Sequence, residues 1–130
     1  MSRKNPLIVF EGIEGTGKTT LIKYVSAYFK KKKISFVKIR EPGGNKNSEL
    51  IRKLILNKRN KFNSFTDLML YFAARSENVE KILNKYYGKK IILIDRFTDS
   101  TLAYQHYGMK LDKLLINRIN KILLKKIKPK

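Results

Sequence analysis

The sequence contains no cysteine, and this absence removes two classes of structure. The chain can form no disulfide and can hold no metal through thiolate ligands, so its composition fits a reducing compartment. It also lacks an apolar run long enough to cross a bilayer. The N-terminal stretch Met1–Pro6 lacks the apolar core and small-residue cleavage site of a secretory signal. We therefore expect a cytoplasmic protein without a membrane segment.

Acidic residues are scarce: 10 of them face 30 lysines and arginines, for a formal net charge of +20. A field of this sign attracts phosphates, whether they belong to nucleotides, nucleic acids or membranes. The lysines, however, are scattered or lie in runs beside expected helices, as at Lys30–Lys33. We therefore expect no dedicated nucleic-acid surface.

Short apolar runs alternate with stretches of helical periodicity along the chain. With 130 residues and 42% hydrophobic composition, the chain can build one domain around one core. Strands alternating with helices indicate a parallel sheet with helices on both faces, a three-layer α/β/α fold. The expected strands are 7–10, 34–39 and 91–94, and the expected helices are 18–32, 48–57, 66–85 and 111–127. On the first helix, the expected apolar stripe consists of Leu21, Ile22, Val25 and Phe29.

A glycine-rich segment follows the first expected strand and matches the pattern G-x-x-x-x-G-K-[ST]. Such a loop turns its backbone N–H groups around phosphates, its lysine reaches the β- and γ-phosphates, and its hydroxyl ligates Mg²⁺. The position between a buried strand and an amphipathic helix is the context that this motif requires. The residues expected to hold ATP are Gly12, Ile13, Glu14, Gly15, Thr16, Gly17, Lys18, Thr19 and Thr20.

Asp95 ends the third apolar run, so its carboxylate should project at the edge of the sheet from which the glycine-rich loop also emerges. We expect Asp95 to lie beside the Mg²⁺ that Thr19 ligates. The alternative is an ordinary aspartate in a turn after a strand.

Arg75 lies four residues from both Tyr71 and Val79, so it falls on the apolar stripe of the expected helix 66–85. A charged side chain that faces inward needs an acceptor. The acceptor could be a ligand oxygen, with the neighbouring aromatic residues as a stacking wall. Alternatively, it could be an acidic residue in a structural ion pair.

Together these features resemble bacterial thymidylate kinase, a family of P-loop nucleoside-kinase-like proteins. The resemblance is carried by four blocks in the family's order: Phe10–Thr20, Arg40–Gly44, Leu70–Arg75 and Asp95–Gln105. The last block is specific and is not expected in a generic P-loop ATPase. The resemblance implies transfer of the ATP γ-phosphoryl group to dTMP, with Mg²⁺ as cofactor, on the route to dTTP.

The resemblance also implies roles for individual residues. Lys18, Asp95, Arg96 and Glu14 would form the catalytic set, with Glu14 facing the sugar and phosphate end of dTMP. Arg52 and Arg96 would hold the dTMP phosphate, and Arg75 would bind thymine with Phe72 or Tyr71 stacked on the base. The Glu41–Pro42 bond is similar to a cis-proline turn. The expected substrate-binding residues are Arg40, Pro42, Arg52, Tyr71, Phe72, Arg75, Arg96, Ser100, Thr101, Tyr104 and Gln105.

The chain departs from the family pattern in three places. Gly15 stands where some members carry an arginine, which indicates the type whose catalytic basic residues lie in a mobile lid. Gly108, Met109 and Lys110 replace a stretch that often contains arginine. The sequence ends at Lys130, before a lid or the last strands of the sheet. We therefore expect a single P-loop kinase domain over residues 1–130, truncated at its C-terminus, with an incomplete sheet.

Two other functions stay open on the sequence alone. One is a P-loop kinase for another acceptor, such as a deoxynucleoside or a different nucleoside monophosphate. The other is a basic nucleotide- or nucleic-acid-binding fragment with impaired catalysis. Two arginines directed at a phosphate, Arg52 and Arg96, favour a monophosphate acceptor. The family implies a homodimer for its full-length members.

Overall fold

Three parallel strands form the sheet, in the order β1-β3-β2, in a computed structural model that describes residues 5–12, 17–97 and 112–129. The strands are β1 (Leu7–Phe10), β2 (Phe36–Arg40) and β3 (Ile91–Asp95). The last residues of β1 and β2, Phe10 and Arg40, are both in register with Asp95. The three strands therefore end level with one another, and the residues that follow them emerge at one edge of the sheet.

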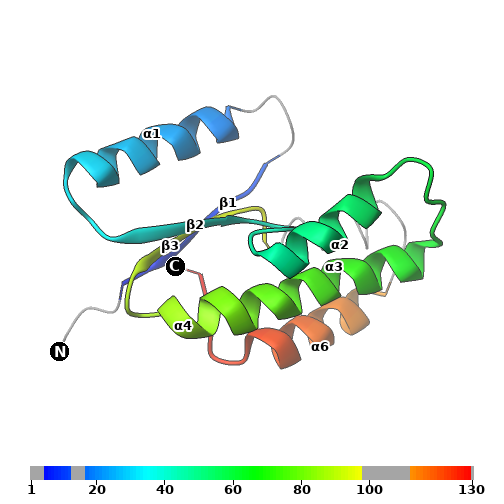
Figure 1. Cartoon of the computed structure of the whole chain (residues 1–130). Helices are drawn as coiled ribbons and strands as arrows, with labels where there is room; N and C mark the ends of the chain where they lie inside the picture. The colour runs from blue at the N-terminus through cyan, green and yellow to red at the C-terminus, as the bar shows by residue number, and fades with distance from the viewer. Residues whose placement is uncertain (1–4, 13–16, 98–111, 130) are drawn as a thin grey trace.

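Helices cover both faces of this sheet, which confirms the three-layer prediction (Figure 1). Helix α1 lies on one face, while the long α3–α4 segment and α6 lie on the other, with α2 beside α3. The expected helix 66–85 is one continuous segment with a π-helical turn, η1, inside it. The helices are α1 (Lys18–Lys31), α2 (Lys46–Leu56), α3 (Ser64–Asn78), η1 (Val79–Leu83), α4 (Asn84–Tyr86) and α6 (Lys113–Leu124).

The centre of the core is β3, where Ile92, Leu93 and Ile94 are all fully buried. Consecutive buried residues are the pattern of a central strand that is covered on both faces. One apolar cluster joins this strand to Val79 and Leu83 of η1 and to the end of the chain. A second cluster packs α3 against α6 through Leu68, Phe72 and Ile116. Within the described part of the chain, no helix is long and apolar enough to span a bilayer.

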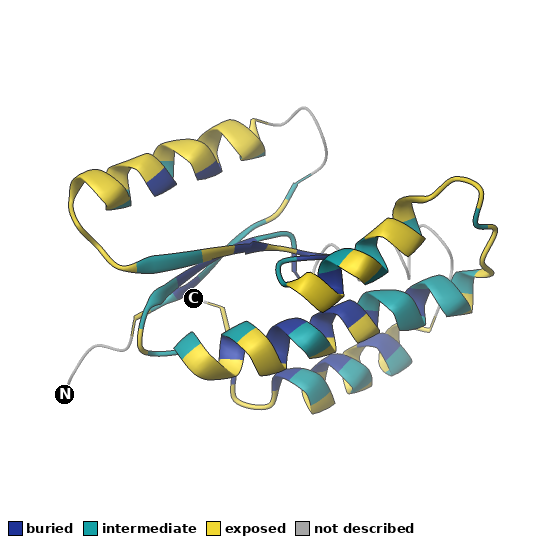
Figure 2. Ribbon diagram, in the orientation of Figure 1, coloured by how far each residue is buried: buried dark blue, intermediate teal, exposed yellow. Residues whose placement is uncertain are grey.

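The predicted apolar stripe of α1 was partly wrong. Ile22 is buried, but Leu21 is 51% exposed, and most of α1 is open to solvent (Figure 2). The reason is geometric, because α1 meets the sheet along a narrow line and buries fully only Ile22 and Ser26. Periodicity alone gives a wider stripe than the contact that one helix makes with a three-stranded sheet.

The starts of β2, α2 and α6 differ from the predicted ones, because hydrogen bonds at the ends of helices set these boundaries. Strand β2 begins at Phe36 rather than Ile34, because the Ile34 N–H donates to the Phe29 carbonyl oxygen at 2.9 Å and belongs to the end of α1. Helix α2 starts two residues before the predicted Ser48, because the Asn45 side chain caps it. Similarly, α6 begins after its cap, Asp112, and covers less than the predicted 111–127.

A buried polar network ties the loop after β2 to α2 and α3. Asn78 is fully buried, and its Nδ2 donates to the Gly43 carbonyl oxygen at 2.5 Å. Its Oδ1 accepts from Asn45 Nδ2 at 2.7 Å. On α2, the hydroxyl of Ser48 donates to the Ala74 carbonyl oxygen at 2.7 Å. This loop is therefore held by specific hydrogen bonds as well as by apolar packing.

Replacement of Asn78 by alanine should destabilise the fold by about 2 kcal/mol or more, because it leaves buried groups of the loop without partners. Urea unfolding followed by circular dichroism measures this loss. Asn84→Ala is the matched control, since Asn84 is exposed at the start of α4 and the same substitution removes nothing buried. Equal unfolding free energies for the two variants would contradict the importance of the network.

Candidate functional site

The described part of the P-loop stands at the edge where the strands end. Gly17 precedes α1 with φ 79°, in the left-handed region that favours glycine. A Cβ atom at this position would meet nothing within 4 Å, so glycine serves the backbone conformation and not a lack of space. Ile13, Glu14, Gly15 and Thr16 lie outside the described residues, and their roles stay predictions.

Lys18 and Asp95 form an ion pair between the first turn of α1 and the end of β3. The Lys18 ammonium donates to Asp95 Oδ1, with the Lys18 side chain largely buried and that of Asp95 half-buried. The prediction that Asp95 projects toward the P-loop is thereby confirmed. The role of Asp95 beside Mg²⁺ and the alternative, an ordinary aspartate in a turn after a strand, are not distinguished by this pair.

The ends of β1 and β3 are also tied to each other just beyond the sheet. The Arg96 N–H donates to the Phe10 carbonyl oxygen at 2.9 Å, and the Phe97 N–H donates to Glu11 Oε1 at 2.8 Å. Arg96 has φ 67°, an uncommon conformation for a residue other than glycine. This turn redirects the chain after Asp95. The sequence prediction did not include Glu11, whose contribution here is to hold a backbone N–H.

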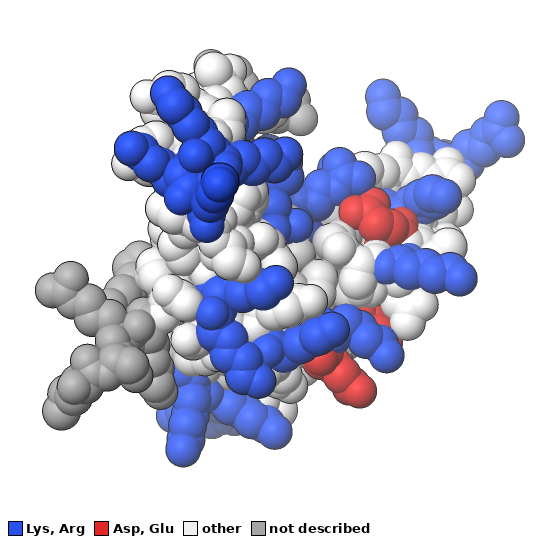
Figure 3. Space-filling view, turned by 60° about the vertical axis from the view of Figure 1, so that its left-hand side comes forward, with Lys and Arg blue, Asp and Glu red and all other residues white. Residues whose placement is uncertain are grey.

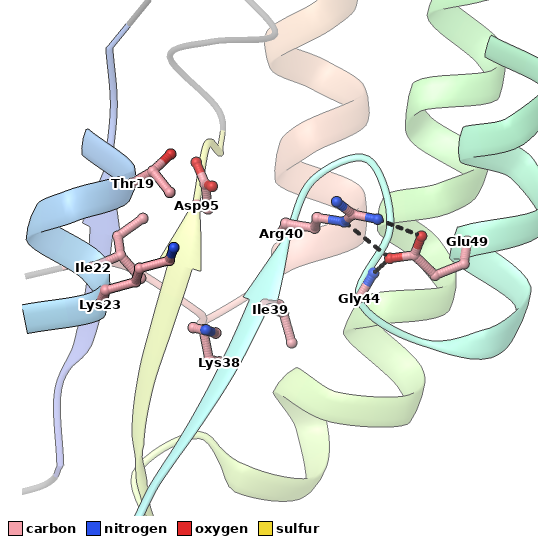
Figure 4. Close-up of a pocket in the computed structure, with 9 residues that line it drawn as sticks. All are labelled: Thr19, Ile22, Lys23, Lys38, Ile39, Arg40, Gly44, Glu49 and Asp95. Carbon is pink, nitrogen blue, oxygen red and sulfur yellow. Dashed lines mark hydrogen bonds and ion pairs between the residues drawn. The ribbon is translucent and has the colours of Figure 1, made fainter. Parts of the chain in front are cut away.

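A cavity of about 460 Å³ opens beside this pair, between α1, β2 and the start of the loop after β2. Figure 4 shows Thr19 and Asp95 close together at one end of it, and Arg40 extended toward Glu49 at the other. Its lining consists of Thr19, Ile22, Lys23, Lys38, Ile39, Arg40, Gly44, Glu49 and Asp95. The predicted metal ligands Thr19 and Asp95 thus line the same space.

Thr19 and Asp95 supply one hydroxyl and one carboxylate oxygen, the donor type that Mg²⁺ prefers. No cluster of three or more His, Cys, Asp or Glu side chains suited to a metal occurs among the described residues. One hydroxyl and one carboxylate fit Mg²⁺ as part of its ligand set, with further ligands to complete the coordination.

Glu49 binds both Arg40, at the end of β2, and the loop that follows β2. Its two oxygens accept from Arg40 Nε at 3.2 Å and Nη2 at 2.9 Å, and Oε1 also accepts from the Gly44 N–H at 3.0 Å. The hydrogen bond from Arg40 is the main reason that the pKa of Glu49 is lowered to about 2. A Cβ atom on Gly43 would lie 2.5 Å from Glu49 Oε1, so this close approach needs glycine. The sequence prediction missed Glu49, which reads as a surface residue of an amphipathic helix.

Arg52 packs beneath the same loop and donates from Nη1 to the Pro42 carbonyl oxygen at 2.8 Å. Burial lowers the pKa of its guanidinium, and the positive charges of Arg40 and Arg96 lower this pKa further. Arg40 and Arg96, from two other segments, therefore lie close enough to Arg52 for their charges to act on its guanidinium. That Arg52 and Arg96 hold a phosphate together stays a prediction.

Arg75 faces inward, as its position on the apolar stripe predicted, and is only 2% exposed. Its Nε and Nη2 lie 2.7 and 2.6 Å from Glu41 Oε2, and its Nη1 donates to Asn120 Oδ1 at 2.5 Å. Its Cζ lies 5.1 Å from the ring of Phe97 and 6.0 Å from that of Phe72. The ion pair that the sequence left as an alternative is thus present, with Glu41 as its acid. A contact with thymine stays a prediction.

The two candidate stacking residues lie in different surroundings. Phe72 is buried against Arg75, whereas Tyr71 is half-buried and lies near enough to Arg52 to affect the pKa of its guanidinium. The Glu41–Pro42 peptide bond is cis, as expected. Four predicted substrate-binding residues lie outside the described part: Ser100, Thr101, Tyr104 and Gln105.

Comparison with known proteins decides between the families that this geometry allows. The family model described as "Thymidylate kinase" matches residues 10–130. The chain belongs to the thymidylate kinase family. It is 40% identical over 127 residues to the thymidylate kinase of Thermoanaerobacter sp. (strain X514), a match that covers 97% of this chain and 63% of that protein. It is 44% identical over 119 residues to the thymidylate kinase of Nostoc punctiforme, with 89% and 56% coverage.

Solved structures agree with this assignment. The crystal structure of thymidylate kinase from Ehrlichia chaffeensis superposes with a TM-score of 0.81 at 38% sequence identity, over 97% of this chain and 69% of that one. The P-loop kinase fold is therefore that of the thymidylate kinase family. This chain spans 63% and 56% of the length of the two curated thymidylate kinases above.

In this thymidylate kinase family member, Glu49 should contribute stability that is lost in acid. Its folded pKa of about 2 lies below the value of about 4.3 for an unfolded glutamate, so the contribution is present above about pH 4.3 and disappears toward pH 2. Glu49→Gln should therefore make the free energy of unfolding fall less steeply with acidification. The effect is small, because the Glu49 side chain is 37% exposed and solvent screens the pair.

Urea unfolding at a series of pH values between about 5 and 2 measures this dependence. Glu80→Gln is the control, because it removes one exposed carboxylate elsewhere on the surface. A Glu49→Gln variant whose pH profile is parallel to that of the unchanged chain would contradict the pairing.

Proposed function

We propose that the protein transfers the γ-phosphoryl group of ATP to dTMP and so forms dTDP, with Mg²⁺ as cofactor, on the route to dTTP. The observation that carries this proposal is the cavity beside the Lys18–Asp95 pair, which Thr19, Arg40 and Asp95 line. Arg40 also lies near enough to Arg52 for its charge to lower the pKa of the Arg52 guanidinium. Like charges that repel one another in a partly buried site gain a compensating partner when a phosphate binds. Family membership supports the same reaction.

On the donor side, the P-loop from Gly12 to Thr20 would hold the triphosphate. Gly17 precedes α1 in a left-handed conformation, and the first N–H groups of this helix would face the phosphates, with the helix dipole adding to their attraction. Lys18 would place its charge at the β- and γ-phosphates once these replace Asp95 as its partner. Thr19 and Asp95 would hold Mg²⁺, which supplies charge neutralisation at the phosphate oxygens.

On the acceptor side, Arg52 and Arg96 would hold the dTMP phosphate, and Arg40 lies within electrostatic reach of Arg52. Arg75 would bind a carbonyl oxygen of thymine, and we assign the stacking role to Phe72, which lies against Arg75. The rest of the binding set is carried over from the family motifs: Glu14, Pro42, Tyr71, Ser100, Thr101, Tyr104 and Gln105.

Catalysis by this arrangement is a matter of positioning and electrostatics. Two phosphate-bearing ligands repel each other, and the arginines with Lys18 offset that repulsion so that the reacting oxygens can approach in line. No covalent intermediate with the enzyme is needed.

A nucleic-acid-binding function is the weaker alternative. On the face shown in Figure 3, lysine and arginine side chains form one group at the upper left and several others, with uncharged surface between the groups. A nucleic-acid site needs a continuous basic patch or stripe. We therefore propose no nucleic-acid partner. We further propose a cytoplasmic location, which the absence of cysteine fits.

A panel assay tests the proposed reaction. ADP release is measured with dTMP, dCMP, dAMP and dGMP as acceptors, on this chain and on a fusion to the residues that follow the matched segment in the Thermoanaerobacter relative. We expect dTMP to be the preferred acceptor and turnover to be highest in the fusion. Faster turnover with another acceptor would refute the proposed substrate.

Arg52→Ala should raise the KM for dTMP by about tenfold or more, because a charge-assisted contact to phosphate is lost. Arg59→Ala is the matched control, since Arg59 is an exposed arginine just after α2. If both variants keep the KM of the unchanged protein, Arg52 does not hold the acceptor phosphate.

We also propose a homodimer, which the family implies for full-length members. Three helices that lie side by side, α2, α3 and α6, expose large apolar side chains. These are Leu50 and Leu54 on α2, Phe65 on α3, and Leu114 and Ile122 on α6. Exposed apolar groups on adjacent helices are typical of an interface that association covers.

Sedimentation equilibrium tests this association. The Leu54→Lys variant should weaken the dimer, because it places a charge in the proposed interface. Tyr24→Lys, an exposed apolar-to-lysine change on α1, should leave the dimer intact. A monomer at all concentrations, or equal weakening by both variants, would contradict the assignment of the dimer to these helices.

A further inference from the structure

Two helices that pack against each other each carry a polar residue on the buried face. On α3 this residue is Arg75, and on α6 it is Asn120, which is 8% exposed. Asn120 lies four residues from both Ile116 and Leu124, and both of these are buried. A buried amide is costly unless it is hydrogen-bonded, so the position calls for a partner. That partner is Arg75, whose Nη1 donates to Asn120 Oδ1 at 2.5 Å.

Glu41 meets the same guanidinium on another edge. Its Oε2 accepts from Arg75 Nε at 2.7 Å and lies 2.6 Å from Nη2. Its Oε1 is buried and has no hydrogen-bond partner among the described residues, so the described contacts of this carboxylate all go to Arg75. Glu41 itself is placed by its backbone N–H, which donates to the Asp95 carbonyl oxygen at 2.9 Å.

Among the described residues, two acceptors hold the guanidinium from different sides. Glu41 alone holds the Nε and Nη2 edge through one oxygen, which leaves the plane able to pivot about that oxygen. Asn120 holds the opposite nitrogen, Nη1, and removes this pivot. The rings of Phe97 and Phe72 flank the group, with centroids 5.1 and 6.0 Å from Cζ. Residues from the loop after β2 and from α6 thus both orient Arg75.

We propose that Asn120 is a positioning residue for recognition of the acceptor base, acting through the orientation of Arg75. This inference rests on the proposed function, in which Arg75 binds a carbonyl oxygen of thymine. It gives α6 a part in base selection without any contact between α6 and the ligand. A guanidinium that only donates discriminates between a carbonyl oxygen and an amino group at the same position of a pyrimidine. The discrimination depends on its direction, which Asn120 helps to hold.

Equilibrium binding of dTMP and of dCMP to the chain tests this role. Asn120→Leu keeps a side chain of similar size on the apolar stripe but removes the acceptor for Nη1. We expect the preference for dTMP over dCMP to fall by about tenfold, the factor that corresponds to the loss of one hydrogen bond to a charged group. Asn120→Asp keeps an acceptor oxygen at the same position and should restore most of the preference.

Asn117→Leu is the matched control, because Asn117 is exposed on the same helix one turn away and should leave the preference unchanged. Urea unfolding of each variant separates loss of orientation from loss of the fold. A structural role alone would lower stability in Asn120→Leu and leave the preference intact, and this result would overturn the inference. An unchanged chain with no preference for dTMP would instead refute the proposed function, and the inference would fall with it.

In the fusion protein, the same change should raise the KM for dTMP by about tenfold while kcat changes less, because the contact is made in the bound ground state as well as in the transition state. A fall in kcat at constant KM would contradict a role in base binding. If Asn120→Leu does not fold, Asn120→Ser provides the second variant, since its shorter side chain cannot reach Nη1 but adds no bulk.

Discussion

An arginine on the apolar face of a helix can remain charged only where acceptors meet it, and in this fold Glu41 and Asn120 meet Arg75. This buried contact joins three segments that are far apart in the sequence: the loop after β2, α3 and α6. Because a buried pair whose partner is removed leaves an uncompensated charge, the three segments must assemble together. The same loop, which carries Glu41 and Pro42, is joined to the end of β3 by the Glu41 N–H, which donates to the carbonyl oxygen of Asp95, the residue that meets Lys18.

Two arginines of the site pair with carboxylates, and the two pairs differ in their exposure to solvent. Arg40 and Glu49 are both substantially exposed, and a pair of this kind contributes little net stability, on the order of 0 to 1 kcal/mol. A phosphate could therefore replace Glu49 as the partner of Arg40 at small cost. Arg75 and Glu41 are desolvated, so separating them would be expensive. The exposed arginine is thus suited to exchange its partner, and the buried one is suited to stay in place.

Much of this arrangement could be predicted from the sequence, and the rest could not, for identifiable reasons. The three strands, the helix that follows the P-loop and the approach of Asp95 to Lys18 follow from local periodicity and from the rule that parallel strands end at one edge. The inward direction of Arg75 follows from its place on a stripe. Its partners lie 34 and 45 residues away, and no local pattern specifies which polar residue a helix will meet.

Glu49 and Asn78 were missed because polar residues on an amphipathic helix look like surface residues until packing buries their atoms. Leu21 was predicted to be buried but is exposed. Periodicity gives the direction of a side chain on α1, but not how wide the contact between α1 and the sheet is.

The missed residues share one physical role, which explains why they surround the site. Asn78 holds the Gly43 carbonyl, Glu49 holds the Gly44 N–H and Arg40, and Glu41 and Asn120 hold Arg75. In each case a buried or half-buried polar group fixes the direction of an adjacent donor or acceptor. Such groups add little net stability compared with apolar packing of equal volume, yet they exclude alternative arrangements of the loop, because any of these would leave a buried group unpaired. A site that acts by positioning charged ligands needs its arginines in defined directions. The polar network is therefore best understood as the means by which a small three-stranded sheet specifies those directions.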